Sequence, residues 1–190
     1  LGRVLPKNHP DVVETERNLG AALAAQNRFD EATAALTGAL ELARVTNGTD
    51  HESVLTLLTD LGAVAATAGD FQAAERWLTE AAEIVRRKPP ENAATSISAL
   101  KSLATLWMLQ DRLEEAVALF RATLELIAQV AQTRELEDDA RGDVECTLGD
   151  ALLALGRFEE AEHHHRAAVA EVRAGRVTDG RLKVRSLDGL

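Results

Sequence analysis

The chain has 190 residues, and 21 Lys and Arg against 31 Asp and Glu give a formal net charge of -10 at pH 7. This acidic balance repels nucleic-acid phosphates and anionic lipid, so we expect no binding to nucleic acid or to a membrane. Hydrophobic residues make up 46% and aromatic residues only 3%, and Gly (12) and Pro (4) are few, which argues against sandwiches and barrels and favours an all-α fold.

Four segments of the chain share one residue pattern, at spacings of 42, 42 and 45 residues. Each begins with a leucine and a small residue, namely Leu19-Gly20, Leu61-Gly62, Leu103-Ala104 and Leu148-Gly149. A large apolar residue follows in each segment, namely Phe29, Phe71, Leu113 and Phe158. An alanine comes three residues later, namely Ala32, Ala74, Ala116 and Ala161. A period of this length indicates a repeat architecture.

In chain order, the pattern predicts eight helices in four antiparallel hairpins. They are expected over residues 10–26 and 30–46, 51–68 and 71–87, 91–110 and 112–131, and 135–155 and 157–174. Each hairpin turns at a short polar or Gly-containing break, namely Asn27-Arg28, Gly69-Asp70, Asp111-Arg112 and Gly156-Arg157. The small residues let the paired helices approach closely, and the large residue after the break is expected to close the corner. One hairpin cannot bury its apolar faces alone, so neighbouring hairpins must stack into an α-solenoid.

The pattern resembles the tetratricopeptide repeat, whose signature combines Leu-Gly with large residues, Ala and an aromatic residue at fixed offsets. The resemblance covers about residues 9 to 173. The period and the linker Asn8-His9-Pro10-Asp11-Val12 resemble the kinesin light chain variety, which is widespread in bacterial signalling proteins, and the abundant Arg and Ala agree with a bacterial origin. The linkers before the third and fourth repeats depart from this variety.

The resemblance implies a right-handed α-solenoid of four tetratricopeptide-like helix hairpins plus partial flanking helices. We expect one domain over residues 1–190, with repeats at about 9–50, 51–90, 91–134 and 135–174. Residues 175–190 are expected to begin a further helix, and the chain to be a fragment of a larger protein.

The sequence carries no recognisable catalytic or cofactor motif, since GxxxxGK[ST], HExxH and CxxC are all absent. We therefore expect no enzyme, no cofactor and no metal site. His163-His164-His165 cannot converge on one metal ion, because successive helical residues point about 100° apart. His165 falls where the other repeats have Leu36, Leu78 and Phe120, which predicts a partly buried packing residue. The alternative is a histidine that loosens the last hairpin below about pH 6.

Three further residues have competing interpretations. Cys146, the single cysteine, is expected on the inner face of the seventh helix, where it could be a redox-sensitive thiol or a small groove or core residue. We favour the groove or core residue, because no second Cys could resolve an oxidised thiol. Trp77 and Trp107 could anchor a ligand, as aromatic residues do at binding hot spots. Trp107 takes a large-residue register, however, and is expected in the core, whereas Trp77 is expected on the convex side or its rim. The acidic residues at 135–139 are expected to stabilise the start of the seventh helix.

In tetratricopeptide arrays the first helices line a concave groove that holds an extended peptide or a helix, and the resemblance implies the same here. The candidate groove residues are Arg17, Asn18, Thr56, Thr59, Asp60, Ser98, Lys101, Ser102, Thr105, Asp143 and Asp150. Their hydroxyls and amides could bond a peptide main chain. Only Arg17, Asn18 and Lys101 could form the carboxylate clamp of some family members. The acidic fourth-repeat end favours a ligand that bears Lys or Arg.

We therefore expect a cytoplasmic interaction module that binds a protein or peptide and scaffolds or regulates a partner or a linked catalytic domain. The alternative is a structural array that self-associates through its exposed ends and has no peptide ligand.

Overall fold

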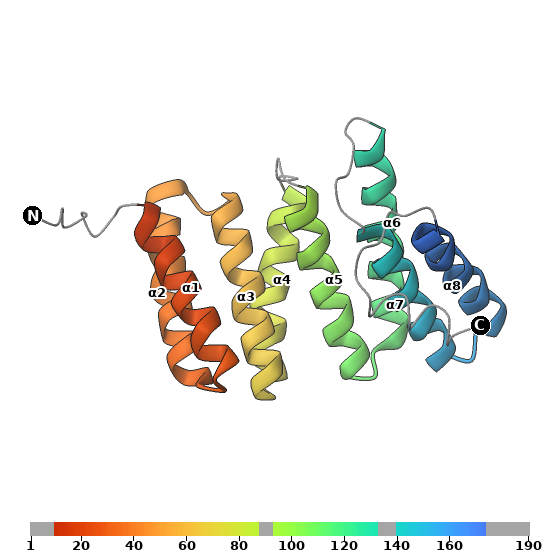
Figure 1. The fold of residues 1–190 in the computed structure, drawn as a ribbon, viewed down its shortest axis with the longest axis horizontal. Helices are drawn as coiled ribbons and strands as arrows, with labels where there is room; N and C mark the ends of the chain where they lie inside the picture. Colours follow the sequence, from red (N-terminus) through yellow and green to blue (C-terminus); the bar gives the residue numbers. More distant parts are fainter. Residues whose placement is uncertain (1–9, 88–92, 133–139, 174–190) are drawn as a thin grey trace, which may run out of the picture. The chain divides into compact units, whose positions relative to one another are not determined.

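A computed structural model of the protein describes residues 10–87, 93–132 and 140–173. These residues form eight α-helices and no strand (Figure 1), which confirms the all-α fold class. The helices are α1 (Pro10–Ala25), α2 (Phe29–Asn47), α3 (Glu52–Ala68), α4 (Phe71–Arg87), α5 (Ala93–Leu109), α6 (Leu113–Ala131), α7 (Ala140–Ala154) and α8 (Phe158–Arg173).

The helix bounds differ from the predicted ones by no more than one residue wherever the predicted end is described. Several predictions lie outside the described residues, namely the helix starts at 91 and 135, the helix end at 174, the acidic residues at 135–139 and the further helix at 175–190. The repeat bounds and the expectation of one domain over the whole chain stay predictions.

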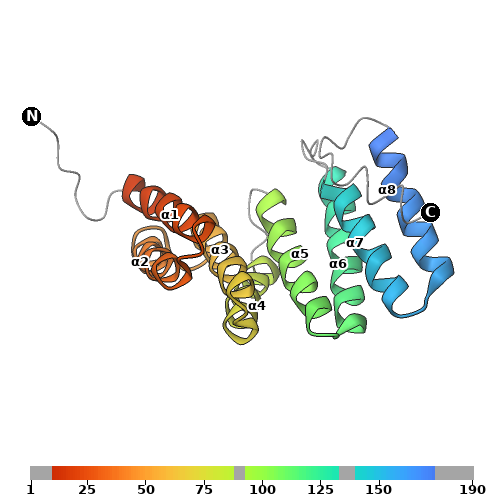
Figure 2. The same ribbon diagram turned by 60° about the horizontal axis from the view of Figure 1, so that its bottom comes forward.

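The chain divides into two compact units, one up to Ser102 and one from Leu103, with the division inside α5. In the N-terminal unit, α1 packs on α2 and α3, and α3 packs on α2 and α4. In the C-terminal unit, α7 packs on α6 and α8. Figures 1 and 2 show α1 beside α2, α3 beside α4, and α7 beside α8, as the predicted hairpins require.

One turn geometry closes all four hairpins. Its first residue has a positive φ angle, at Asn27 (61°), Gly69 (84°), Asp111 (62°) and Gly156 (74°). The N–H group of the next residue donates to the carbonyl five residues back, at 2.8 to 3.0 Å. The N–H group of the left-handed residue itself donates to the carbonyl three residues back. This pair of bonds is the Schellman motif, and only Gly, Asn and Asp routinely adopt its left-handed residue, which explains the composition of the breaks.

The residue after the left-handed position anchors the second helix of each hairpin. In three hairpins it is an arginine whose Nε and Nη2 donate to both carboxylate oxygens of a glutamate three residues later, at 2.6 to 2.8 Å; the pairs are Arg28–Glu31, Arg112–Glu115 and Arg157–Glu160. In the remaining hairpin, Asp70 Oδ1 accepts a hydrogen bond of 2.9 Å from the Ala73 N–H. Each turn is therefore tied to the helix that follows it.

Small residues allow the paired helices to touch. A Cβ atom would lie 2.6 Å from Leu36 Cγ if added at Gly20, and 2.4 Å from Leu78 Cγ if added at Gly62. The second small residue of the pattern is an alanine in every hairpin, and it is 0% exposed throughout, at Ala32, Ala74, Ala116 and Ala161. The predicted packing role of these residues is confirmed.

The prediction that a large residue closes each corner is wrong for two hairpins. Phe71 is 39% exposed and Phe158 is 67% exposed, whereas Phe29 and Leu113 are half-buried. Each is the first residue of its helix, at the end of the hairpin next to the turn, and the ring of Phe158 stays largely in contact with solvent.

Trp107 is half-buried rather than part of the core, contrary to prediction. It lies close to the end of α5, where the Arg112 guanidinium of the following turn covers its ring at 4.9 Å from the centroid. This cation–π contact holds the indole ring against the turn and not in the core between the helices. Trp77, on α4, is also half-buried.

Candidate functional site

An ion pair joins the first two helices of the predicted binding face. Arg17 Nε on α1 donates to Asp60 Oδ2 on α3 at 2.7 Å, and Arg17 Nη1 lies 3.4 Å from Glu14 Oε1. The side chains of Arg17 and Asp60 are 36% and 35% exposed. The hydrogen bond with Asp60 raises the pKa of Arg17, against a smaller opposing effect of burial. Two predicted groove residues are thus in contact, and the guanidinium is already held by carboxylates.

A second polar contact joins the next pair of first helices. Thr95 Oγ1 on α5 donates to Glu52 Oε1 on α3 at 3.0 Å, and both side chains are half-buried. Like Arg17 and Asp60, the two residues are 43 positions apart. Polar side chains therefore connect successive repeats on this side of the N-terminal unit. Sequence reasoning missed the contact because Glu52 and Thr95 lie one turn away from the groove positions that it selected.

Two of the three threonines predicted for the groove, both on α3, donate their hydroxyl protons within that helix. Thr56 Oγ1 donates to the Glu52 carbonyl at 3.0 Å, and Thr59 Oγ1 donates to the Leu55 carbonyl at 2.9 Å. Each hydroxyl oxygen keeps lone pairs that can accept another hydrogen bond. A peptide N–H could therefore bond to these side chains without breaking the existing bonds.

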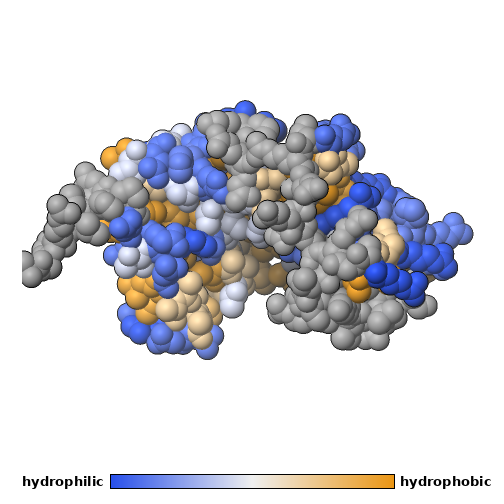
Figure 3. Space-filling model, turned by 45° about the horizontal axis from the view of Figure 1, so that its top comes forward, coloured by the Kyte–Doolittle hydropathy of each residue, from blue (hydrophilic) through white to orange (hydrophobic). Residues whose placement is uncertain are grey.

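The remaining candidates differ in exposure. In the N-terminal unit, Asn18 on α1 and Ser98 on α5 are exposed, whereas Lys101 and Ser102 are half-buried. On the face drawn in Figure 3, the N-terminal helices present hydrophilic residues beside hydrophobic ones. In the C-terminal unit, Thr105 is exposed, and Asp143 and Asp150 are half-buried on α7. A single groove formed by all eleven residues stays a prediction.

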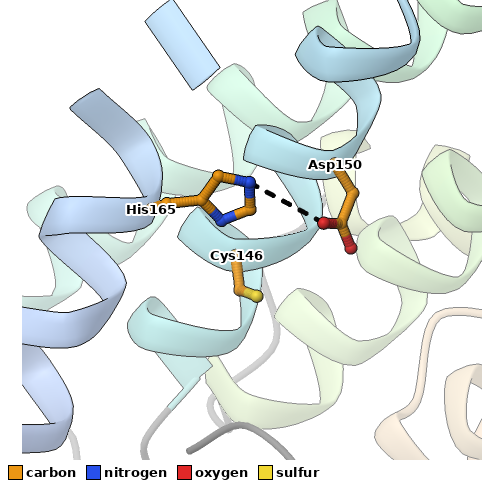
Figure 4. A group of neighbouring side chains, drawn as sticks. All are labelled: Cys146, Asp150 and His165. Carbon is orange, nitrogen blue, oxygen red and sulfur yellow. Dashed lines mark ion pairs between the residues drawn. The ribbon is translucent and has the colours of Figure 1, made fainter. Parts of the chain in front are cut away.

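The C-terminal unit contains a cluster that sequence reasoning missed. Cys146 and Asp150 on α7 lie beside His165 on α8 (Figure 4). Cys146 is 0% exposed and packs with Ala168 and Val172, so of the two predicted positions, groove or core, the structure places it in the core. The ring of His165 is 1% exposed and lies against Gly149, just as Leu36 lies against Gly20, which confirms its predicted register. The sequence signal that could have revealed the cluster is His165 itself, a polar residue at a repeat position that is apolar in the other three repeats.

Beside this cluster, Glu145 is almost completely buried but not isolated. Its Oε2 lies 2.7 Å from His164 Nδ1, and its Oε1 lies 3.5 Å from Arg141 Nε. A buried carboxylate is tolerated only when it is paired in this way. The pair joins α7 to α8, so we assign it a structural role.

None of the described helices is both long and apolar enough to cross a membrane.

Models of the tetratricopeptide repeat match residues 11–87, 96–133 and 146–164, which together make up most of the chain. The chain belongs to the tetratricopeptide repeat family. A curated relative, Protein KINESIN LIGHT CHAIN-RELATED 1 of Arabidopsis thaliana, is 22% identical over 165 residues, which are 86% of this chain and 26% of the relative. The chain thus spans about a quarter of the length of that relative, and the predicted likeness to kinesin light chains is confirmed.

Solved structures agree on the tetratricopeptide-type helical fold. BtubC (BKLC) from P. vanneervenii has a TM-score of 0.76 at 21% identity, over 92% of this chain and 69% of that one. The Rap conjugation gene regulator of the plasmid pLS20, solved in complex with the Phr* peptide, has a TM-score of 0.65 at 16% identity, over 90% of this chain and 46% of that one.

Proposed function

We propose that this chain is a protein-interaction module that binds an extended peptide or a helix on the face of its first helices. The observation that carries the proposal is the set of accessible polar groups on α1, α3 and α5 of the N-terminal unit. Asn18 and Ser98 are exposed, and the hydroxyl oxygens of Thr56 and Thr59 can still accept hydrogen bonds. The family and the peptide complex of one structural neighbour support the same function.

The charges on this face favour a ligand with Lys or Arg side chains. Arg17 is held between Glu14 and Asp60, so two carboxylates accompany one guanidinium there. A ligand carboxylate would have to displace Asp60 from Arg17, which makes the carboxylate clamp of other family members a poor model for this face.

Selection from a random displayed peptide library tests the proposal, followed by fluorescence anisotropy with the enriched peptides. Asn18→Trp and Ser98→Trp place large side chains at exposed positions of the proposed face. Each should weaken peptide binding at least tenfold. The matched control is Gln72→Trp, at an exposed position of the second helix α4, which should leave the affinity unchanged. Equal affinities in all three variants, or the recovery of no peptide, would contradict the proposal.

Self-association is the second candidate, and exposed apolar side chains in the first and last hairpins favour it. Leu19 on α1 is 48% exposed, Leu153 on α7 is 39% exposed, and Phe158 on α8 is 67% exposed. Sedimentation velocity over a range of concentrations distinguishes the two functions. A concentration-dependent oligomer that Phe158→Glu abolishes would support an array, whereas a monomer at every concentration favours the peptide module.

In this proposal the chain acts in the cytoplasm, and it scaffolds or regulates a partner or a linked catalytic domain without catalysing a reaction itself. Family membership supports a binding role of this kind. Turnover of any substrate by this chain alone would contradict it.

A further inference from the structure

Three side chains with metal-binding atoms meet between α7 and α8. Cys146 and Asp150 are four residues apart on α7 and therefore share one face of the helix, and His165 reaches them from α8 (Figure 4). A sulfur atom, a carboxylate oxygen and a ring nitrogen lie within 4.8 Å of one another. The three residues come from two helices that pack on each other, so the fold of the last hairpin sets their arrangement.

The buried ring of His165 distinguishes this cluster from a chance neighbourhood of polar residues. It is 1% exposed, and neither of its ring nitrogens has a hydrogen-bond partner. Its Nε2 lies 3.8 Å from Asp150 Oδ1, which is too long for a hydrogen bond. Buried polar atoms are nearly always satisfied, so two unsatisfied nitrogens in one ring call for an explanation.

Comparison with the other hairpins strengthens this point. The equivalent positions hold Leu36 and Leu78, each packed on a glycine of the partner helix, so an apolar side chain fits the site without difficulty. Only the fourth hairpin has an imidazole there, and only there do a thiol and a carboxylate occupy the facing positions, where the first hairpin has Arg17 and Ala21. The change is concerted across two helices.

We propose that Cys146, Asp150 and His165 bind a divalent transition-metal ion, with Zn²⁺ the best match. Thiolate, imidazole and carboxylate are the ligands that Zn²⁺ takes in proteins, whereas Mg²⁺ and Ca²⁺ prefer oxygen ligands alone. Binding releases the Cys146 thiol proton to solvent, because the thiolate is the ligand. The ion satisfies one nitrogen of His165 and connects α7 to α8.

The geometry is close to that of a zinc site. Tetrahedral bonds of about 2.0 to 2.3 Å place the ligand atoms roughly 3.4 to 3.6 Å apart, so the cluster must contract by about 1 Å. Rotation of the Asp150 side chain, which is 28% exposed, can supply this movement. The same exposed side leaves room for water or an external donor as the fourth ligand.

Cobalt titration of the whole chain, freed of metal by a chelator, tests the proposal. Co²⁺ should bind at one equivalent and give both a thiolate-to-cobalt charge-transfer band and the intense d–d bands of tetrahedral coordination. Zn²⁺ should displace it and raise the melting temperature. The absence of a charge-transfer band at one equivalent would overturn the site.

Variants assign the ligands. His165→Leu restores the residue of the first two hairpins, so it should fold, lose the charge-transfer band and bind Zn²⁺ at least 100-fold more weakly. Cys146→Ser should also lose the band. Asp150→Asn should weaken Zn²⁺ binding at least tenfold, and because Asp150 is partly exposed, this variant should still fold. The matched control His163→Gln, at an exposed histidine, should bind as the wild type does. Unchanged binding in Asp150→Asn, or loss of binding in His163→Gln, would contradict the assignment.

Discussion

At the scale of single residues, the close distance between paired helices depends on glycines, which have no Cβ atom. Gly62 lies so close to Leu78 that a Cβ atom would be 2.4 Å from Leu78 Cγ. Gly38, in the middle of α2, has no heavy atom within 4 Å of the same added atom. A side chain at Gly62 would therefore clash with Leu78, whereas a side chain at Gly38 would meet no neighbour.

Gly62→Ala should destabilise the protein by about 1 to 3 kcal/mol, because the methyl group forces Leu78 out of its packed rotamer. The matched control Gly38→Ala should stabilise it by about 0.5 to 1 kcal/mol, since alanine is the better helix former and meets no neighbour. Urea denaturation followed by circular dichroism measures both changes. Similar effects of the two substitutions would show that helix propensity, not close packing, governs Gly62.

The sequence predicts residues that recur in register better than residues that are unique to one repeat. Gly62 and Ala74 could be assigned to close contacts because the same residue types return in other repeats. The contact of Arg17 with Asp60 could not be predicted, because it depends on the conformations of two long side chains across a repeat boundary. The contact of His165 with Asp150 was missed because the three adjacent histidines were considered as one group, without the residues of the helix that they face.

At the scale of elements, the hairpin turn explains why the helix bounds were predictable. A left-handed residue must end the first helix, and the Asn, Asp and Gly residues that adopt this conformation mark the position in the sequence. Burial beside the turn was less predictable. The exposure of Phe158 depends on which helices pack next to α8, and this cannot be read from the pattern within one hairpin.

The arginine–glutamate pair after the turn should make stability depend on acid pH. The hydrogen bond from Arg28 lowers the pKa of Glu31 in the folded protein. The pair therefore contributes stability above the ordinary glutamate pKa of about 4.3, and this contribution is lost as the pH falls through the lowered folded pKa. Glu31→Gln should lower the melting temperature at neutral pH and flatten its decline toward acid.

Thermal melts across this pH range check the prediction, with Glu41→Gln, at an exposed position of the same helix, as the control. The control should follow the wild-type profile. A Glu31→Gln profile parallel to that of the wild type would mean that the pair contributes nothing to the pH dependence.

At the scale of the molecule, each described hairpin contacts its neighbours in sequence. Within the N-terminal unit α3 contacts α1 and α2 of the preceding hairpin, and within the C-terminal unit α7 contacts α6 of the preceding hairpin. Stability in repeat proteins is approximately a sum of hairpin and nearest-neighbour contributions. A local change should therefore have a local effect.

Arg17→Gln should increase amide hydrogen exchange in α1 by no more than about fivefold, because the ion pair with Asp60 is partly exposed. Exchange in α7 and α8 should stay unchanged. Hydrogen exchange with mass spectrometry resolves these segments. Equal acceleration in every helix would show that the chain unfolds as one cooperative unit.

The recurring Schellman turn also bears on how such a chain can evolve. All four hairpins reverse direction through the same backbone geometry, while the outward residues of their first helices differ. Duplicating or exchanging a whole hairpin would therefore keep the chain reversal intact and alter only the side chains offered to a ligand. New binding specificity can therefore arise by recombination of existing hairpins, while the fold stays the same.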